Sequence, residues 1–100
     1  MIFANVGTLG AIAGKRDALV ALLIQRSDTL DHVGCLAYEV GISDREPDTV
    51  FVVELWTSAD AHRASLTLPE VQAAIAKARP LLSGEVGGFQ FDVVGSPLRD

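Results

Sequence analysis

The chain has 100 residues, the usual size of one folded domain, so we expect a single domain over residues 1–100. Its formal net charge is −5 and its eight basic residues are scattered, which argues against nucleic acid, whose binding needs clustered lysine and arginine. The single cysteine, Cys35, cannot form an intrachain disulfide, and no Cys/His cluster has metal-site spacing, so we expect no metal. The start lacks the basic region of a signal peptide, and the longest apolar run, residues 18–24, is too short to span a bilayer. We therefore expect a cytoplasmic protein without membrane contact.

The first half of the chain predicts a strand, a helix and a second strand. Residues 2–9 read as a strand bounded by glycines, and residues 15–32 carry apolar side chains at helical spacing. Gly34 follows this helix where a left-handed cap is wanted. Residues 36–42 form the next predicted strand, and the polar residues 43–49 are expected to be a hairpin loop.

The strongest predicted strand, residues 50–56, is apolar on both of its faces. One face carries Val50, Val52 and Trp56, and the other carries Phe51, Val53 and Leu55. A strand that is buried on both faces must be covered twice. The helices of the chain can cover one face, but so short a chain has little left for the other. We therefore expect the sheet of a second copy there, which predicts a homodimer.

The second half predicts a helical region in two parts and a final strand. Residues 57–60 fit a capping box that starts a short helix, and residues 67–70 repeat the box before a second helix. Pro80 ends that helix because it lacks a backbone donor, and residues 85–95 alternate as a strand. The order is β-α-β-β-α-β, which predicts a ferredoxin-like α+β fold with an antiparallel sheet and helices on one face. This fold hosts many functions and by itself names none.

Three segments, in the right order, resemble the antibiotic-biosynthesis-monooxygenase domain family. Residues 34–40 resemble its PGC-x-x-Y segment, with Val33 in place of the proline, and residues 54–56 resemble its E-x-W strand end. Residues 69–71 and the helix after them resemble what the family places after the tryptophan. The resemblance implies a dimeric α+β barrel, in which two sheets pair, and a pocket between sheet and helices in each subunit.

The resemblance also implies an activity. Members of the family include oxygenases that act on quinols or aromatic polyketides without metal or flavin. We therefore expect a cofactor-free monooxygenase that oxidises a small aromatic or quinol-type substrate, with dioxygen as co-substrate. Such an enzyme must hold a flat molecule, help to remove a proton, stabilise the phenolate and exclude water. An apolar pocket with a few polar groups meets these needs.

Three residues are candidates for catalysis. Trp56 could stack on an aromatic ring and donate its indole N–H to a substrate oxygen. Haem-degrading relatives carry an asparagine on this strand, and Asn5 could hold an oxygen atom in place if its side chain points inward. His62 could act as a general base. The alternatives are a core tryptophan, an exposed strand amide and a surface histidine.

Four further residues are candidates for binding the substrate: Tyr38, Glu54, Ser65 and Arg79. Glu54 lies among apolar neighbours and therefore needs a partner, for which we expect Arg63 or Arg79. Cys35 is expected to be a small buried residue rather than a nucleophile.

Ser65 is a departure from the family pattern. Many members carry a histidine at this position, nine residues after the tryptophan, and in haem-degrading relatives a histidine of this region holds the iron. Its replacement by serine argues against haem unless His62 substitutes. The alternatives to a monooxygenase are a haem-binding or haem-degrading protein, a non-catalytic dimeric binding module, and an isomerase with His62 as base.

Overall fold

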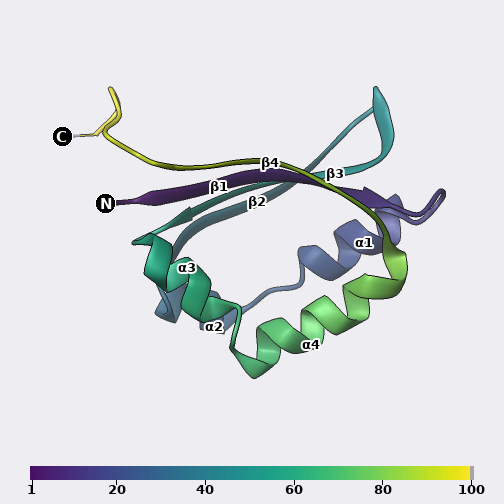
Figure 1. Cartoon of the computed structure of the whole chain (residues 1–100), viewed down its shortest axis with the longest axis horizontal. Coiled ribbons are helices and arrows are strands. Elements are labelled where there is room, and N and C mark those ends of the chain that lie inside the picture. Colours follow the sequence, from purple (N-terminus) through teal and green to yellow (C-terminus); the bar gives the residue numbers. More distant parts are fainter. Residues whose placement is uncertain (100) are drawn as a thin grey trace.

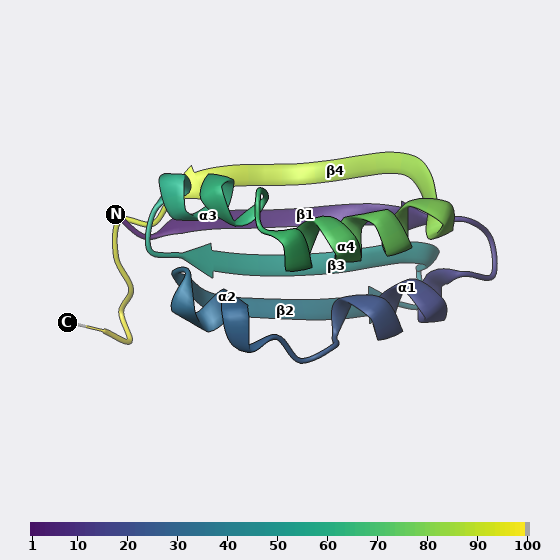
Figure 2. The same cartoon turned by 90° about the horizontal axis from the view of Figure 1, so that it is seen from below.

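The protein is described by a computed structural model over residues 1–99, and its elements follow the predicted order. They are β1 (Phe3–Ala11), α1 (Arg16–Leu23), α2 (Asp28–His32), β2 (Cys35–Ser43), β3 (Glu46–Trp56), α3 (Ala59–Ser65), α4 (Pro69–Ala78), the 3-10 turn η1 (Arg79–Leu81) and β4 (Leu82–Asp92). The strands form one antiparallel sheet in the order β2-β3-β1-β4, and the helices lie on one side of it (Figures 1 and 2). This arrangement confirms the ferredoxin-like α+β fold. None of the helices within residues 1–99 has the length and apolar content that crossing a membrane requires.

The single helix expected over residues 15–32 is wrong, because two helices replace it. α1 ends where the amide of Ile24 donates to the carbonyl of Val20, and a new helix begins after Ser27. The Ser27 hydroxyl accepts from the amide of Leu30 at 3.3 Å, which is the N-cap arrangement that serine favours. Gly34 has φ +99°, so the predicted left-handed cap is confirmed, although it closes α2.

The starts of α3 and α4 also differ from the predicted capping boxes. Ser58, rather than Thr57, caps α3, and its hydroxyl accepts from the amide of Ala61 at 3.0 Å. α4 has no side-chain cap, since it begins at Pro69, whose ring fixes the backbone angle of a first helical turn. The Thr67 hydroxyl donates instead to the carbonyl of Ala64 at 2.7 Å.

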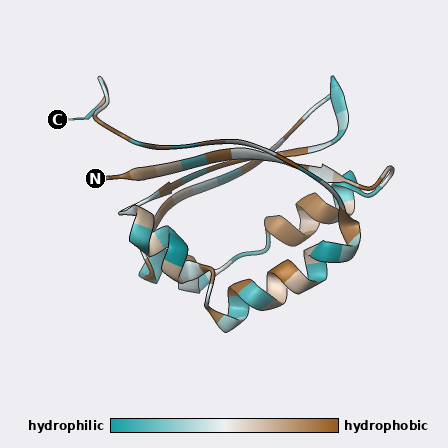
Figure 3. Ribbon diagram, in the orientation of Figure 1, coloured by the Kyte–Doolittle hydropathy of each residue, from teal (hydrophilic) through white to brown (hydrophobic). Residues whose placement is uncertain are grey.

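Strands β3 and β4 each begin earlier than expected. β3 starts at Glu46 instead of residue 50, because the polar residues of the predicted loop still pair with β2, with Ser43 opposite Glu46. β4 starts at Leu82 instead of residue 85, since Leu82 pairs with Ala11. Figure 3 shows polar residues concentrated at the tip of the β2–β3 hairpin and on α3, and apolar residues along α1.

The core lies between the sheet and the pair α1 and α4. Its buried members are Ala11, Leu19, Val50 and Ala78. Leu19 and Val50 have no exposed surface, and burying such side chains stabilises the fold by roughly 1.5–3 kcal/mol each. This core fills one end of the space between the sheet and the helices. The other end, beside α2 and α3, holds the polar residues described below.

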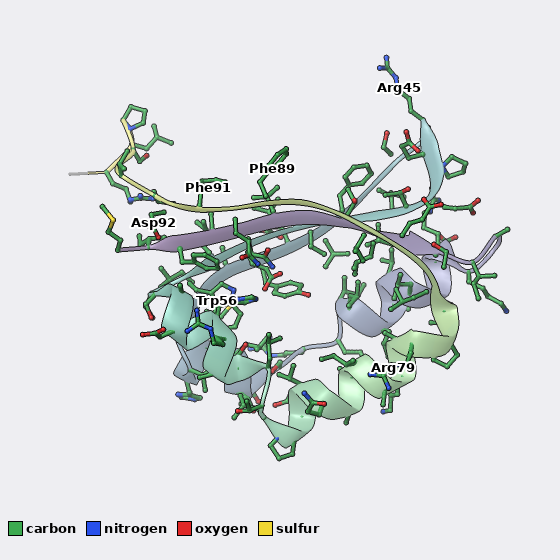
Figure 4. All side chains as sticks on the ribbon, viewed as in Figure 1. Arg45, Trp56, Arg79, Phe89, Phe91 and Asp92 are labelled. Carbon is green, nitrogen blue, oxygen red and sulfur yellow. The ribbon has the colours of Figure 1, made fainter. Side chains whose placement is uncertain are left out.

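The opposite face of the sheet carries mostly apolar side chains, and within residues 1–99 no helix lies on it (Figure 1). We call it the open sheet face, and the strand registers place on it Val6, Phe51, Val53, Leu55, Phe89 and Phe91. Phe89 is 77% exposed, and Figure 4 shows Phe89 and Phe91 pointing away from the helices. The chain therefore covers only one of the two apolar faces of β3.

Candidate functional site

A row of four polar side chains crosses the helix side of the sheet, one from each strand. Tyr38 of β2 is paired with Glu54 of β3, Glu54 with Asn5 of β1, and Asn5 with Gln90 of β4. Directly paired residues of neighbouring strands share a face of the sheet. We call these residues the polar row; Trp56 and Phe3 lie on the same face at the next level toward the strand end.

Glu54 is the buried centre of the polar row, with only 7% of its surface exposed. Oε2 of its carboxylate accepts from Nδ2 of Asn5 at 2.7 Å, and Oε1 accepts from the indole Nε1 of Trp56 at 3.1 Å. The Nε2 atom of His62 lies 3.9 Å from the same Oε1. These contacts explain how a carboxylate remains beneath the helices, because a buried charge needs hydrogen bonds and a partner.

The prediction that Arg63 or Arg79 pairs with Glu54 is wrong. Arg63 points outward and binds Asp60, one turn earlier on α3, at 2.8 Å. Figure 4 shows Arg79 at the far end of α4 from Trp56. The rotation of α3 therefore offers His62, and not its neighbour, to the carboxylate.

His62 reaches the sheet from α3 and packs between two aromatic rings. The centroid of its ring lies 5.5 Å from that of Phe3 and 5.3 Å from that of Trp56. Only 14% of its side chain is exposed. The amide of Thr57 donates to the carbonyl of Gly34, which ties the start of the α3 segment to the end of α2. An imidazole held beside a carboxylate in this way is suited to accept a proton.

Asn5 and Trp56 hold Glu54 in place, which differs from their expected roles toward a substrate oxygen. The indole N–H and one amide N–H of Asn5 are both donated to the carboxylate. The Oδ1 atom of Asn5 accepts from Nε2 of Gln90 at 3.3 Å, so Gln90 orients the asparagine amide. Sequence reasoning missed Gln90 as a site residue, although Gln90 alternates with Phe89 and Phe91 along the predicted strand and so belongs to the opposite face.

Tyr38 and Cys35 lie on the β2 side of Glu54. Burial, and then the negative charge of Glu54, raise the pKa of the Tyr38 phenol to about 12, so it stays protonated at neutral pH. Burial and Glu54, in that order, also raise the pKa of the Cys35 thiol, which donates to the carbonyl of Ala37 at 3.5 Å. Tyr38 therefore keeps its phenol O–H, which a bound molecule could accept from, and Cys35 has the protonated form of an unreactive thiol.

Two pockets flank the polar row. The β2 pocket, about 430 Å³, lies between β2 and the α1–α2 segment, and its walls include Leu23, Leu30, Cys35, Leu36, Tyr38 and Val40. The α3 pocket, about 240 Å³, is lined by Phe3, Ala59, His62, Arg63, Leu66 and Gln90. The polar row thus begins in the wall of one pocket and ends in the wall of the other.

Ser65 and Arg79 are not brought to this cluster. The Ser65 hydroxyl is buried and donates to the carbonyl of His62 at 2.6 Å, so it bonds within its own helix. Neither residue is in the wall of these two pockets. Within residues 1–99, no three His, Cys, Asp or Glu side chains converge as a set of metal ligands.

Comparisons with known proteins place the chain among related sequences and structures. The family model described as antibiotic biosynthesis monooxygenase matches residues 2–77. A structure from Chloroflexus aurantiacus, named as a candidate antibiotic biosynthesis monooxygenase, is 37% identical, with 96% of each chain covered and a TM-score of 0.83. One from Deinococcus radiodurans with the same kind of name is 25% identical, covers 96% of this chain and 95% of its own, and has a TM-score of 0.73. A Nitrosomonas europaea structure, at 8% identity, coverages of 93% and 90% and a TM-score of 0.81, shares the fold. No curated protein sequence matches the chain.

The network around Glu54 predicts a measurable stability effect. We expect Asn5→Ala to lower the free energy of unfolding by about 1.5–3 kcal/mol, because it removes a short hydrogen bond to a buried carboxylate. Urea unfolding at neutral pH measures this loss. The control is Arg63→Ala, which breaks an exposed ion pair and should cost less than about 0.5 kcal/mol. Equal effects of the two substitutions would show that Glu54 does not depend on Asn5.

Proposed function

Because the chain belongs to the antibiotic biosynthesis monooxygenase family, we propose that it is a cofactor-independent monooxygenase of a small aromatic or quinol-type substrate. Dioxygen is the co-substrate. The observation that carries the proposal is the buried Glu54 carboxylate, which two donors hold within 3.9 Å of an imidazole and which belongs to a polar row that reaches a pocket at each end.

The proposed reaction depends on a group that accepts the O–H proton of the substrate. An electron-rich phenol or enol that loses its O–H proton can transfer an electron to dioxygen directly. The resulting substrate radical and superoxide combine into a peroxide anion at a ring carbon that carries hydrogen, and this anion takes up a proton to give a hydroperoxide. Loss of water then leaves one oxygen as a carbonyl and the other in the water molecule. The substrate itself supplies all four electrons, so no external reductant enters the balance.

The cluster around Glu54 supplies the proton acceptor. Glu54 and His62 form a pair in which either group receives a proton and the other stabilises the product of that transfer. Asn5 and Trp56 fix the carboxylate, so the pair is organised before the substrate arrives. Burial keeps competing water away from the carboxylate and strengthens its electrostatic effect.

Oxygen consumption with a panel of hydroquinones tests this function. We expect the wild-type protein to consume dioxygen faster than free solution does, and expect Glu54→Gln and His62→Gln each to slow it by about a hundredfold, the lower end of what a general base contributes. Asn5→Ala and Trp56→Phe should slow it less, because they only loosen the carboxylate. The control is Arg45→Ala, at the exposed tip of the β2–β3 hairpin (Figure 4), which should leave the rate unchanged.

Two outcomes would contradict the proposal. Wild-type protein that binds hydroquinones without consuming oxygen would indicate a binding module. A strong visible absorption band on adding haem, in a protein that oxidises no hydroquinone, would indicate the haem-binding alternative.

We further propose that the protein works as a homodimer in which two open sheet faces pack together. The support is the exposed apolar surface of this face, where the exposed fraction is 77% for Phe89 and 51% for Phe91. Burying apolar surface contributes about 25 cal/mol per Å², and the same patch on both copies suits a twofold interface. A second copy would also supply the second cover that β3 lacks.

The oligomeric state tests the dimer. We expect wild-type protein to be dimeric in light scattering at micromolar concentration and Phe89→Asp to be monomeric, because the charge would be buried without a partner. The control is Ile12→Asp, which places a charge on another exposed apolar residue away from the open sheet face. A wild-type monomer, or equal dissociation by both substitutions, would refute this interface.

A further inference from the structure

We infer that the two pockets have different tasks: the β2 pocket holds the aromatic substrate, and the α3 pocket is the path by which its proton leaves. The proton would pass from the substrate through Tyr38 and Glu54 to His62, and from His62 to solvent in the α3 pocket. This inference rests on the proposed function and adds to it the location of the substrate and the direction of proton transfer.

The sizes of the two pockets suit these different tasks. The β2 pocket has about 430 Å³, within the roughly 300–1,000 Å³ range of small-molecule sites, and its walls combine apolar residues with polar ones, among them Ser27, Asp31 and Glu39. Leu23, Leu30 and Val40 could sandwich a flat ring, with the Tyr38 hydroxyl as a polar anchor. The α3 pocket has about 240 Å³, below that range, and His62, Arg63 and Gln90 are in its wall. It is better suited to water or a small buffer molecule than to a substituted ring.

Glu54 is the only carboxylate of the polar row and lies between Tyr38 and Asn5 along it. Its charge acts on Tyr38 and Cys35, which are both in the wall of the β2 pocket. On its other side it faces His62, which is in the wall of the α3 pocket. A substrate in the β2 pocket therefore meets Tyr38 and Glu54 before His62.

The proton balance follows this order. The O–H bond of the substrate breaks and its proton bonds to the phenol oxygen of Tyr38, as the proton of Tyr38 bonds to Glu54. The Glu54 O–H then breaks and an N–H forms at Nε2 of His62, once the 3.9 Å separation closes by about 1 Å. The imidazolium finally releases a proton to water in the α3 pocket. No electrons leave the substrate in these steps; they leave in the later reaction with dioxygen.

Filling each pocket separately tests the assignment. We expect Leu30→Phe, in the β2 pocket, to raise KM about tenfold with little change in kcat, since it competes for space with the substrate. We expect Ala59→Phe, in the α3 pocket, to leave KM unchanged within about twofold. Leu36→Phe is a second variant for the β2 pocket in case Leu30→Phe does not fold. The reverse pattern, with KM raised by Ala59→Phe alone, would overturn the inference.

Rescue of a histidine variant tests the proton path. We expect His62→Ala to lose about a hundredfold in kcat and added imidazole to restore part of it. Ala59→Phe in the same background should abolish the rescue, and Leu30→Phe should preserve it. Rescue that is blocked by Leu30→Phe, or that is unaffected by Ala59→Phe, would show that His62 exchanges its proton elsewhere.

A binding measurement separates this inference from the proposed function. Trp56 is the only tryptophan of the chain, so its fluorescence reports on hydroquinone binding without oxygen. We expect Leu30→Phe to weaken this binding and Ala59→Phe to leave it intact. A protein that binds this way but consumes no oxygen would refute the monooxygenase and keep the substrate site. A protein that consumes oxygen but binds hydroquinone in the α3 pocket would keep the monooxygenase and refute the substrate site.

Discussion

The burial of one carboxylate constrains the rest of this structure. Glu54 lies buried beneath the helices, where Asn5 and Trp56 donate to its carboxylate and His62 stands beside it. Those contacts require β1 and β3 to keep their register and α3 to present one particular side of its first turns. At this end of the sheet, the fold therefore supplies the hydrogen bonds that water would otherwise give to the Glu54 carboxylate.

The two faces of the sheet serve opposite physical purposes. The helix side combines an apolar core at one end with the polar row at the other, so a reactive group can be kept dry and still be hydrogen-bonded. The open sheet face carries Thr8 and Glu39 among mostly apolar side chains, and its exposed phenylalanines gain most from contact with other apolar surface. In the proposed enzyme, association through one face would rigidify the strands that carry the site on the other.

The order of elements and the two apolar faces of β3 could be predicted from sequence, because both follow from local periodicity. The partners of Glu54 could not. Asn5 is 49 residues away from it, and Gln90 is 85 residues away from Asn5, so their meeting depends on strand register. Arg63 was the natural guess as a partner, but the turn of α3 directs it to Asp60. The break between α1 and α2 could not be predicted from periodicity, because the apolar residues on either side of it still follow helical spacing. Only the cap at Ser27 marks the start of the new helix.

The central claim is that Glu54 and His62 accept the proton as one unit. The most direct test compares oxygen uptake in the two single variants, Glu54→Gln and His62→Gln, with uptake in the double variant. If the pair acts as a unit, the double variant will be about as slow as the slower single variant, because the second substitution removes nothing further. A double variant whose loss equals the product of the two single losses would show that the residues act independently and would contradict the account.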